Sequence, residues 1–315
     1  MYGGEVLITG GTGSLGRMLV KRLLGTDVQR VIVYSRDELK QYEMSQMFKD
    51  ERIRYFIGDV RDRDRLRMAF DGVDTVIHAA ALKQVPACEY NPFEAVKTNI
   101  LGAQNVIEAA LEKGVRKVMG VSTDKACAPT NAYGKSKAMA EALFVAGNSY
   151  AGSKATRFSV VRYGNVVGSR GSVIPFFKGL AHTGKIPVTD KRMSRFWITL
   201  GDAVKFVLEC VERMDGGEIF VPKLPSMLVV DLAEAICPGC EQQIVGIRPG
   251  EKIHEVLLTA DEARRTIDHD CYIIQPEFPW WGDPKRLTKL LPEGFEYCSG
   301  TNDRWLSVSD LEGMV

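Results

Sequence analysis

The sequence predicts an α/β protein that contains a doubly wound parallel sheet and a smaller C-terminal lobe. Short β-branched runs alternate with helical stretches across the first half of the 315 residues, which is typical of a parallel sheet covered by helices on both faces. A glycine-rich turn follows the first of these runs, at residues 10–16. After residue 165, frequent glycines and prolines break the chain into short pieces. We therefore expect a Rossmann-like sheet, followed by a smaller lobe built from shorter helices and strands.

The individual elements follow from the spacing of apolar residues. Buried-type runs predict strands at Glu5–Thr9, Val28–Tyr34, Arg52–Ile57, Thr75–His78, Lys117–Val121 and Phe158–Tyr163. Apolar residues three and four apart predict helices at Leu15–Leu24, Arg65–Phe70, Pro92–Lys113 and Tyr133–Ser149. The apolar faces of these helices should cover the sheet, so function must depend on the polar residues that interrupt the pattern.

Composition narrows the class of protein. Lys and Arg number 41 against 40 Asp and Glu, so no overall positive charge favours nucleic acid or an anionic membrane as a partner. No stretch has the roughly 20 apolar residues that span a bilayer, and we expect a soluble, cytoplasmic protein. The 7 cysteines show no disulfide spacing and fit a reducing compartment. Cys237-Pro-Gly-Cys240 is a lone CxxC, which we interpret as a chance feature of a helix end rather than a metal or redox site.

The glycine turn is the first candidate binding site. Gly10, Gly13 and Gly16 lie between a predicted strand and a predicted helix, where glycines permit a tight turn and let a pyrophosphate approach the helix end. This context indicates a dinucleotide. We expect the contacts to come from Gly10, Thr12, Gly13, Ser14, Leu15 and Gly16.

The end of the second strand bears on the choice between NADP and NAD. NAD-binding chains place a carboxylate there for the adenosine ribose, whereas this chain has Ser35 and Arg36. A guanidinium can bind a 2'-phosphate with two charge-assisted bonds, and Lys40 could add a second cation, so we predict NADP. Asp37 keeps NAD open as the alternative. After the third strand, Asp59 and Val60 are placed to border the adenine, although Asp59 could instead start the helix after residue 61.

The division of the chain follows from this site. We expect an NADP-binding Rossmann domain in residues 1–164 and a substrate-binding lobe in residues 165–315. The helical stretch at 201–214 should pack back on the first domain.

Candidate catalytic residues lie after the fifth strand and on the helix that follows. Tyr133 and Lys137 are one helical turn apart, so Lys137 could lower the pKa of Tyr133 and also reach the nicotinamide ribose. We expect a phenolate near neutral pH that takes the O4 proton while hydride leaves C4 of a sugar. Thr123 could hydrogen-bond the same oxygen.

Asp124 and Lys125 offer a second acid and base at the carboxyl edge of the sheet. Once C4 is a ketone the C5 proton is acidified, and a partly desolvated Lys125 could be neutral enough to remove it. A buried Asp124 could protonate the departing 6-hydroxyl. A surface ion pair between the two residues is the alternative interpretation.

These residues, with the blocks around them, give the chain a family resemblance. It resembles the inverting UDP-N-acetylglucosamine 4,6-dehydratases, the first enzymes of pseudaminic acid biosynthesis, within the extended short-chain dehydrogenase/reductase superfamily. The matching blocks are Gly10-Gly-Thr-Gly-Ser14, Tyr34-Ser-Arg-Asp-Glu-Leu-Lys40, Gly58-Asp-Val-Arg-Asp62, His78-Ala-Ala-Ala-Leu-Lys83, Ser122-Thr-Asp-Lys125, Val161-Arg-Tyr-Gly-Asn-Val-Val-Gly-Ser-Arg-Gly171, Arg195-Phe-Trp-Ile-Thr199 and Ile247-Arg-Pro-Gly-Glu-Lys252.

The resemblance implies roles for particular residues. Asp124, Lys125 and Tyr133 would act in catalysis, with Thr123 and Lys137 in support. The cofactor would also contact Ala80, Ala81, Lys83 and Asn99, and the substrate would contact Lys83, Asn165, Arg195, Arg248 and Glu251. An ion pair without a binding role is the alternative for Arg248 and Glu251. The resemblance further implies a homo-oligomer, with a hexamer as the form suggested, and no metal.

Together these observations predict a UDP-N-acetylglucosamine 4,6-dehydratase that inverts C5. NADP would oxidise C4, water would be lost across C5 and C6, and hydride would return to C6. A UDP-sugar 4-epimerase is the nearest alternative, because it needs Tyr133 and Lys137 but not the Asp124 and Lys125 pair. A non-catalytic NADP-binding regulator is the alternative from another class.

Overall fold

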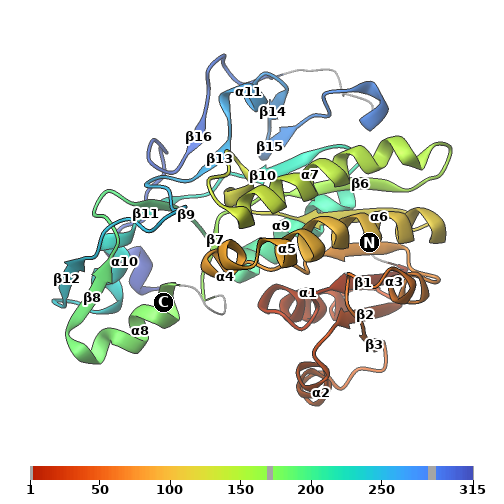
Figure 1. Ribbon diagram of the computed structural model, residues 1–315, viewed down its shortest axis with the longest axis horizontal. Coiled ribbons are helices and arrows are strands. Elements are labelled where there is room, and N and C mark those ends of the chain that lie inside the picture. The colour runs from red at the N-terminus through yellow and green to blue at the C-terminus, as the bar shows by residue number, and fades with distance from the viewer. Residues whose placement is uncertain (1–2, 169–172, 283–288, 315) are drawn as a thin grey trace.

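A nine-stranded sheet forms the centre of the computed structural model, which describes residues 3–168, 173–282 and 289–314. The strand order is β14-β15-β10-β6-β5-β4-β1-β2-β3 (Figure 1). The sheet is parallel from β3 to β10, and β15 and β14 are antiparallel. The strands are β1 (Glu5–Thr9), β2 (Arg30–Ser35), β3 (Ile53–Ile57), β4 (Thr75–His78), β5 (Lys117–Val121), β6 (Arg157–Val161), β10 (Ile219–Pro222), β14 (Thr266–Asp268) and β15 (Cys271–Ile274).

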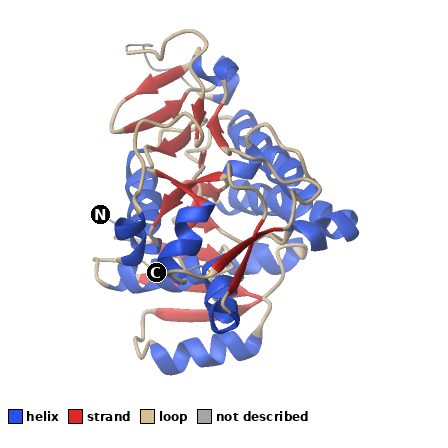
Figure 2. Cartoon of the chain, turned by 90° about the vertical axis from the view of Figure 1, so that its left-hand side faces the viewer, coloured by secondary structure: helices blue, strands red, loops and turns tan. Residues whose placement is uncertain are grey.

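Helices flank this sheet on both sides, as Figure 2 shows. On one side α1 packs against α9, and α9 also contacts β5; on the other, α6 packs against both α3 and α7. The π-helix η1 joins α5 to α6 within the predicted 92–113 helix. The helices of this region are α1 (Ser14–Leu24), α2 (Glu38–Met47), α3 (Arg63–Ala69), α4 (Val85–Tyr90), α5 (Pro92–Ala95), η1 (Val96–Leu101), α6 (Gly102–Lys113), α7 (Ala132–Ala151) and α9 (Leu200–Arg213).

Local sequence explains these elements. In β1 four consecutive residues are buried, as expected for a strand covered on both faces. Helix α9 starts where the Thr199 side chain accepts a hydrogen bond from the backbone of Asp202, and its buried residues recur every three or four positions. Helices α2 and α4 were not predicted. Helix α2 has only two buried residues, Gln41 and Met44, so it shows little apolar periodicity.

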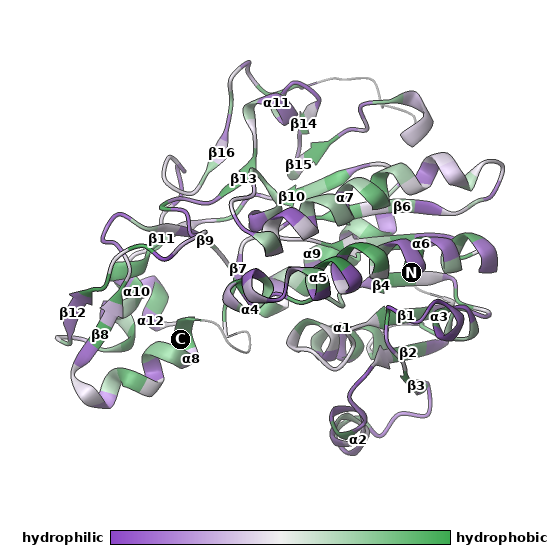
Figure 3. Ribbon diagram, in the orientation of Figure 1, coloured by the Kyte–Doolittle hydropathy of each residue, from purple (hydrophilic) through white to green (hydrophobic). Residues whose placement is uncertain are grey.

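A smaller core lies beside the sheet and is built from segments beyond residue 165. It includes Ile174, Phe177, Trp197, Met227 and Leu232. In Figure 3 the contrast within this region is clear, since α10 is largely green and the neighbouring β12 is purple. Its elements are β7 (Asn165–Val166), α8 (Val173–Leu180), η3 (Ala181–Thr183), β8 (Lys185–Val188), β9 (Ser194–Ile198), β11 (Ser226–Leu228), α10 (Val229–Ile236), β12 (Glu241–Ile244) and α12 (Val308–Glu312).

The C-terminal half also returns to the central sheet. Strand β10 pairs with β6, and β15 and β14 continue the sheet beyond it. Nearby lie β13 (Val256–Leu258), α11 (Ala260–Ala263), η4 (Pro279–Trp281) and β16 (Tyr297–Cys298). The two halves of the chain therefore share one sheet. The predicted division into two domains at residue 164 stays a prediction.

Cys237 and Cys240 form a disulfide in this structure, which corrects our interpretation of the CxxC as a chance feature. Helix α10 ends just before Cys237, and Gly239 turns the chain with φ of +75°. This turn brings the two Cα atoms to 5.5 Å, within the range that a disulfide requires.

Residues 3–168, 173–282 and 289–314 have neither a membrane-spanning helix nor a cluster of metal-ligating side chains. No helix there is long and apolar enough to cross a membrane. No group of three or more His, Cys, Asp or Glu side chains in those ranges could hold a metal ion.

Candidate active site

The glycine turn between β1 and α1 lines a cavity of about 680 Å³. Gly10 has φ of +68°, and a Cβ at this position would lie 2.9 Å from the backbone nitrogen of Ala80. Gly13 is the N-cap of α1 and offers no side-chain hydrogen bond to the first turn of the helix. A helix end of this kind suits the pyrophosphate of a dinucleotide. The predicted turn residues that line the cavity are Gly10, Thr12, Gly13, Ser14, Leu15 and Gly16.

Ser35, Arg36, Asp37 and Lys40 line the same cavity. Asp37 caps α2, since its carboxylate accepts a hydrogen bond from the Lys40 backbone at 3.0 Å and pairs with the Lys40 ammonium. These contacts hold the pKa of Asp37 below its ordinary value. The Arg36 side chain is 54% exposed and lies 3.6 Å from Asp59. The carboxylate that could favour NAD is thus already engaged, whereas the guanidinium is accessible.

Asp59 and Val60 follow β3 and also line this cavity. Two groups of Arg61 donate hydrogen bonds to the Asp59 carboxylate, the backbone amide at 2.9 Å and the guanidinium at 2.7 Å. The next helix is capped by Asp62, which accepts from the Arg65 backbone at 2.9 Å. The alternative in which Asp59 starts that helix is therefore wrong.

Ala80, Ala81 and Lys83 line the cofactor cavity, but Asn99 does not. Asn99 lies in η1 and is 1% exposed. Its side-chain amide exchanges hydrogen bonds of 2.8 and 3.0 Å with the Leu82 backbone and donates one of 2.9 Å to Ser136. The predicted cofactor contact of Asn99 stays a prediction, and in this structure the side-chain amide is engaged by Leu82 and Ser136. Asn99 holds the loop that carries Lys83.

Helix α7 carries Tyr133 and Lys137, and both line the cofactor cavity. Asn131 caps the helix by accepting a hydrogen bond from the Gly134 backbone at 2.8 Å. A Cβ on Gly134 would collide with the carbonyl oxygen of Lys125. Glycine at this position therefore lets α7 pack directly on the turn that carries Lys125.

The protonation states on α7 differ from the sequence prediction. Burial lowers the pKa of Lys137 to about 8, although the Glu141 carboxylate opposes this, and Lys137 Nζ donates to the Val121 carbonyl at 2.7 Å. Burial raises the pKa of Tyr133 to about 12, although Lys125 and a hydrogen bond with Thr123 act the other way. The expected phenolate is therefore wrong for this structure. The ammonium that acts on Tyr133 is that of Lys125, and burial outweighs it.

Thr123, Asp124 and Lys125 form the turn after β5, in η2 (Asp124–Ala126) and its cap. Asp124 is 1% exposed, and its Oδ1 accepts hydrogen bonds from Thr123 Oγ1 at 2.8 Å and Lys125 Nζ at 3.1 Å. Its Oδ2 has no hydrogen-bond partner among the residues that the structure describes. The alternative of a surface ion pair is thus wrong for the Asp124 carboxylate, which is buried beside the cavity.

A second carboxylate, Glu255, lies 3.4 Å from Lys125 Nζ. Burial acts to lower the pKa of Lys125, but Asp124 and Glu255 outweigh it and raise the pKa above its ordinary value. The prediction of a neutral Lys125 is therefore wrong for the structure as it stands. It fails because two carboxylates act on Lys125: the adjacent Asp124, and Glu255 from the C-terminal lobe, which the local sequence did not indicate.

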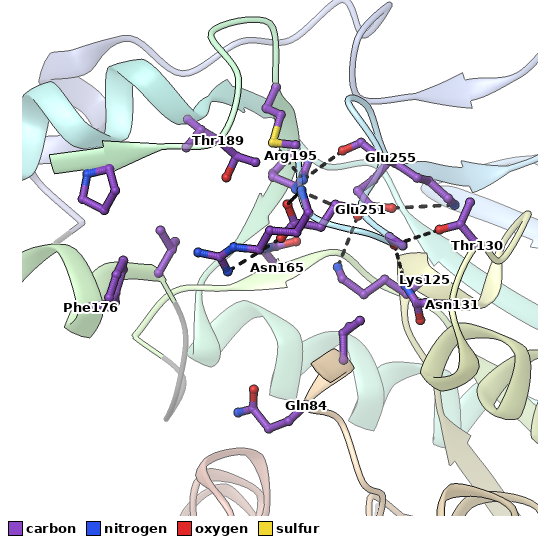
Figure 4. A pocket seen from close by; sticks show the side chains of 18 of the residues that line it. Gln84, Lys125, Thr130, Asn131, Asn165, Phe176, Thr189, Arg195, Glu251 and Glu255 are labelled. Carbon is purple, nitrogen blue, oxygen red and sulfur yellow. Dashed lines mark hydrogen bonds and ion pairs between the residues drawn. The ribbon is translucent and has the colours of Figure 1, made fainter. Parts of the chain in front are cut away.

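A second cavity, of about 700 Å³, adjoins the first, and Lys125 and Asn165 line both. Figure 4 shows Lys125, Arg195 and Glu255 grouped on one side of this cavity, with Phe176 on the other. The predicted substrate residues that line it are Asn165, Arg195, Arg248 and Glu251. Lys83, predicted for both ligands, is among the residues lining the cofactor cavity and not the second one.

The substrate-side residues differ in how far they are already engaged. Arg248 is exposed and its guanidinium is 3.9 Å from Glu251, which is a loose pairing. Arg195 is 11% exposed and donates to three backbone carbonyls, those of Ser194 at 2.7 Å and of Ile253 and Lys252 at 3.0 Å. Arg248 and Glu251 can therefore turn toward a ligand, whereas Arg195 fixes the segment that contains Lys252.

Comparison with known proteins identifies the chain. The family model described as "Polysaccharide biosynthesis protein" matches residues 6–277. This chain belongs to the polysaccharide biosynthesis protein family. The UDP-N-acetylglucosamine 4,6-dehydratase (inverting) of Campylobacter jejuni subsp. jejuni serotype O:23/36 (strain 81-176) is 52% identical to it, over 100% of this chain and 98% of that protein. The resemblance stated from the sequence blocks is thereby confirmed.

Two further relatives are similar over most of the chain. The UDP-glucose 4-epimerase of Rickettsia massiliae (strain Mtu5) is 43% identical, over 92% of this chain and 86% of that protein. The solved structure of Pen from Bacillus thuringiensis has a TM-score of 0.90 and 40% identity, and covers 99% of this chain and 98% of that one. The predicted Rossmann-like α/β fold is confirmed. Of the sequence blocks, positions 169–171 lie outside the described residues.

In this family member, sequence reasoning missed Glu255 and Lys252 as neighbours of the turn at residues 123–127. Lys252 Nζ donates to the Cys127 carbonyl at 2.7 Å and lies 3.7 Å from Glu255. Lys252 belongs to a block that we had already singled out, and Glu255 follows three residues later. Their approach to Lys125 depends on how the C-terminal lobe folds back, which no local spacing shows.

Proposed function

We propose that this protein is an inverting UDP-N-acetylglucosamine 4,6-dehydratase that uses NADP. The observation that carries the proposal is the ion pair between the buried Asp124 and the partly exposed Lys125, 3.1 Å apart, beside Tyr133 where the two cavities meet. A 4-epimerase has no step that requires this pair. The 52% identity to the Campylobacter dehydratase supports the same choice over the 43% identity to the Rickettsia epimerase.

The residues of the first cavity fit a dinucleotide phosphate. The first turn of α1 has no side-chain cap, which leaves its amides for the pyrophosphate, and Arg36 offers a guanidinium for a 2'-phosphate. We expect Lys137, which lines this cavity, to contact the nicotinamide ribose. When bound, NADP supplies the hydride acceptor for C4 of the sugar and later the donor for C6.

The chain's own residues move the protons. The phenol of Tyr133, which lines the cavity, first gives its proton to solvent, and the resulting phenolate takes the O4 proton as C4 is oxidised. The Lys125 ammonium passes a proton to Asp124 Oδ1, 3.1 Å away, which yields a neutral amine and a carboxylic acid together. The amine then removes the C5 proton while the acid protonates the leaving 6-hydroxyl, so water departs and the original ion pair returns. Burial acts in favour of this exchange, since it replaces two charged groups by two neutral ones, whereas the Asp124 and Glu255 carboxylates favour the ammonium and oppose it.

Inversion requires that C5 be reprotonated from the opposite face, which gives the L-arabino 4-keto-6-deoxy product. The pKa values of Lys125 and Tyr133 are both raised, which favours their protonated forms, so both are candidates for the donor. A Lys125→Met variant that still exchanges the C5 hydrogen with solvent would exclude Lys125.

Incubation with UDP-N-acetylglucosamine in deuterated water tests the function. We expect a product one water lighter, with deuterium at C5 and the L-arabino configuration in proton spectra. A product of unchanged mass would indicate the epimerase instead. Tightly bound NADP without turnover of any UDP-sugar would indicate the regulator.

Arg36→Ala should reduce the preference for NADP over NAD. Loss of a hydrogen-bonded cation facing a phosphate costs about 1.5–3 kcal/mol, which corresponds to roughly a 10- to 150-fold weaker affinity for NADP. Binding of NAD should change little. Titration calorimetry with both cofactors measures the effect. Arg63→Ala is a matched control, since Arg63 is 55% exposed and pairs with Glu108 on the surface. Equal losses for both cofactors would contradict the assignment of Arg36.

We also propose that the protein is a homo-oligomer, that it works in the cytoplasm, and that its product feeds pseudaminic acid biosynthesis. Exposed apolar residues on the segment from α4 to η1 support an oligomer, with Tyr90 88% exposed and Phe93 78% exposed. The resemblance suggests a hexamer. A monomeric mass by light scattering would contradict the first of these proposals.

A further inference from the structure

The segment at residues 248–255 is hydrogen-bonded at several points to residues 127–131, which connect the turn that carries Asp124 and Lys125 to helix α7. Thr130 Oγ1 and Asn131 Nδ2 each donate to the Gly250 carbonyl at 2.9 Å. Lys252 Nζ donates to the Cys127 carbonyl at 2.7 Å. These bonds join the segment that carries Arg248 and Glu251 to the start of α7, so the substrate lobe reaches into the catalytic centre.

Glu255 is the deepest contact of this segment. Its side chain is 3% exposed, and its Oε1 lies 3.4 Å from Lys125 Nζ and 3.9 Å from Arg195 Nε. Its Oε2 lies 3.7 Å from Lys252 Nζ and accepts no hydrogen bond from the described residues. The backbone of Glu255 is also fixed, because its amide donates a hydrogen bond to Ser299 Oγ at 2.9 Å. One buried carboxylate thus faces three cations, those of Lys125, Arg195 and Lys252. Figure 4 shows Lys125 and Arg195 beside it.

We infer that Glu255 is a positioning residue of the dehydratase, which holds the Lys125 amine between two carboxylates for proton transfer at C5. The inference rests on the proposed function. Lysine has a flexible four-carbon stem, and a single contact with the adjacent Asp124 would leave its amine free to swing. Glu255 supplies the second fixed point from across the cavity. A lysine held at both sides keeps the alignment that the proton transfer requires.

The charges around Lys125 determine what removal of Glu255 should do. Asp124 and Glu255 favour the ammonium, Tyr133 acts in the same direction, and Arg195 opposes them. Lys252 faces Glu255 from the other side. A Glu255→Gln change removes one of the two carboxylates and leaves three cations without their shared counter-ion. The pKa of Lys125 must therefore fall, whether Lys125 then acts as an acid or as a base.

The test compares wild type, Glu255→Gln and Glu255→Asp with UDP-N-acetylglucosamine in deuterated water across a range of pH. Lys125→Met identifies the limb of the pH profile that belongs to Lys125. For Glu255→Gln we expect kcat to fall about 10²-fold with a smaller change in KM, and that limb to move down by about one pH unit or more. Glu255→Asp keeps the charge and should return the limb toward its wild-type position while kcat stays reduced.

Thermal melts of all variants, with the exposed Glu241→Gln as control, show whether a loss of activity comes from unfolding. A Glu255→Gln enzyme that is folded and has the wild-type kcat and pH profile overturns the inference. So does an equal loss of kcat in Glu255→Gln and Glu255→Asp with no movement of the limb. Wild type that never removes water from the substrate would instead overturn the proposed function, so the two failures are distinguishable.

Discussion

Replacement of Asp124 by Asn is expected to slow water loss from the sugar about 10²- to 10⁴-fold, the range typical of losing a general acid. Asparagine keeps the shape of the side chain and can still accept from Thr123. It cannot take the Lys125 proton, so neither the neutral amine nor the carboxylic acid would form. Oxidation of C4 by contrast depends on Tyr133. We therefore expect the variant to accumulate reduced cofactor while little 4-keto-6-deoxy product appears.

The measurement combines nicotinamide absorbance in a single turnover with the mass of the released sugar nucleotide. Asp261→Asn is the matched control, because the Asp261 side chain is 89% exposed and Asp261 is not among the residues that line the two cavities. Product formation at the wild-type rate by Asp124→Asn would show that another group protonates the 6-hydroxyl. Loss of cofactor reduction together with water loss would show that Asp124 already acts in the first oxidation.

Arg162→Leu should destabilise the protein by about 3–5 kcal/mol, the usual cost of breaking a buried ion pair. Arg162 is 3% exposed and lies between Glu141 of α7, at 2.6 Å, and Glu262 of α11, at 3.0 Å. It also donates to the Leu257 carbonyl at 2.9 Å. Leucine would leave two carboxylates buried without a cation. Because Glu141 is on the helix of Tyr133 and Lys137, we expect activity to fall as well.

Arg116→Leu is the control for this change, since Arg116 makes a similar 2.8 Å contact with Asp74 but is 67% exposed. Its loss should cost no more than about 1 kcal/mol. Chemical denaturation of both variants gives the comparison. Replacement of Arg162, Glu141 and Glu262 together by apolar residues should recover part of the lost stability. Equal midpoints for Arg162→Leu and Arg116→Leu would contradict the argument.

The same cluster has a pH dependence with a definite sign. Burial alone would raise the pKa of Glu262, but Arg162 and Thr259 hold it below its ordinary value. A carboxyl whose pKa is lower in the folded state stabilises the fold at pH values above its unfolded pKa. That contribution is lost as the pH falls through the lower, folded value. Acid should therefore weaken the contact between α7 and α11, and Arg162→Leu should remove much of this acid sensitivity.

Much of the fold could be predicted because its signals are local. The bounds of β1, β4 and β5 agree with the apolar runs, since each strand is buried on both faces and its pattern is complete within five residues. Helix α2 was missed because it has only two buried residues, Gln41 and Met44, which are too few to form an apolar face with helical spacing. Strands β10, β14 and β15 were missed because their place in the sheet depends on partners far away in the chain.

The candidate site shows the same division. Sequence alone determined which groups gather at the carboxyl edge of the sheet, because parallel strands bring their ends together and a helix places Tyr133 beside Lys137. Only the tertiary structure decided which of these groups carry protons. Burial raises the pKa of Tyr133, and Asp124 together with Glu255, which the returning C-terminal lobe brings in, raises the pKa of Lys125. Ionisation depends on solvent exclusion and on charges a few ångströms away, and both are set by residues that meet only when the chain has folded.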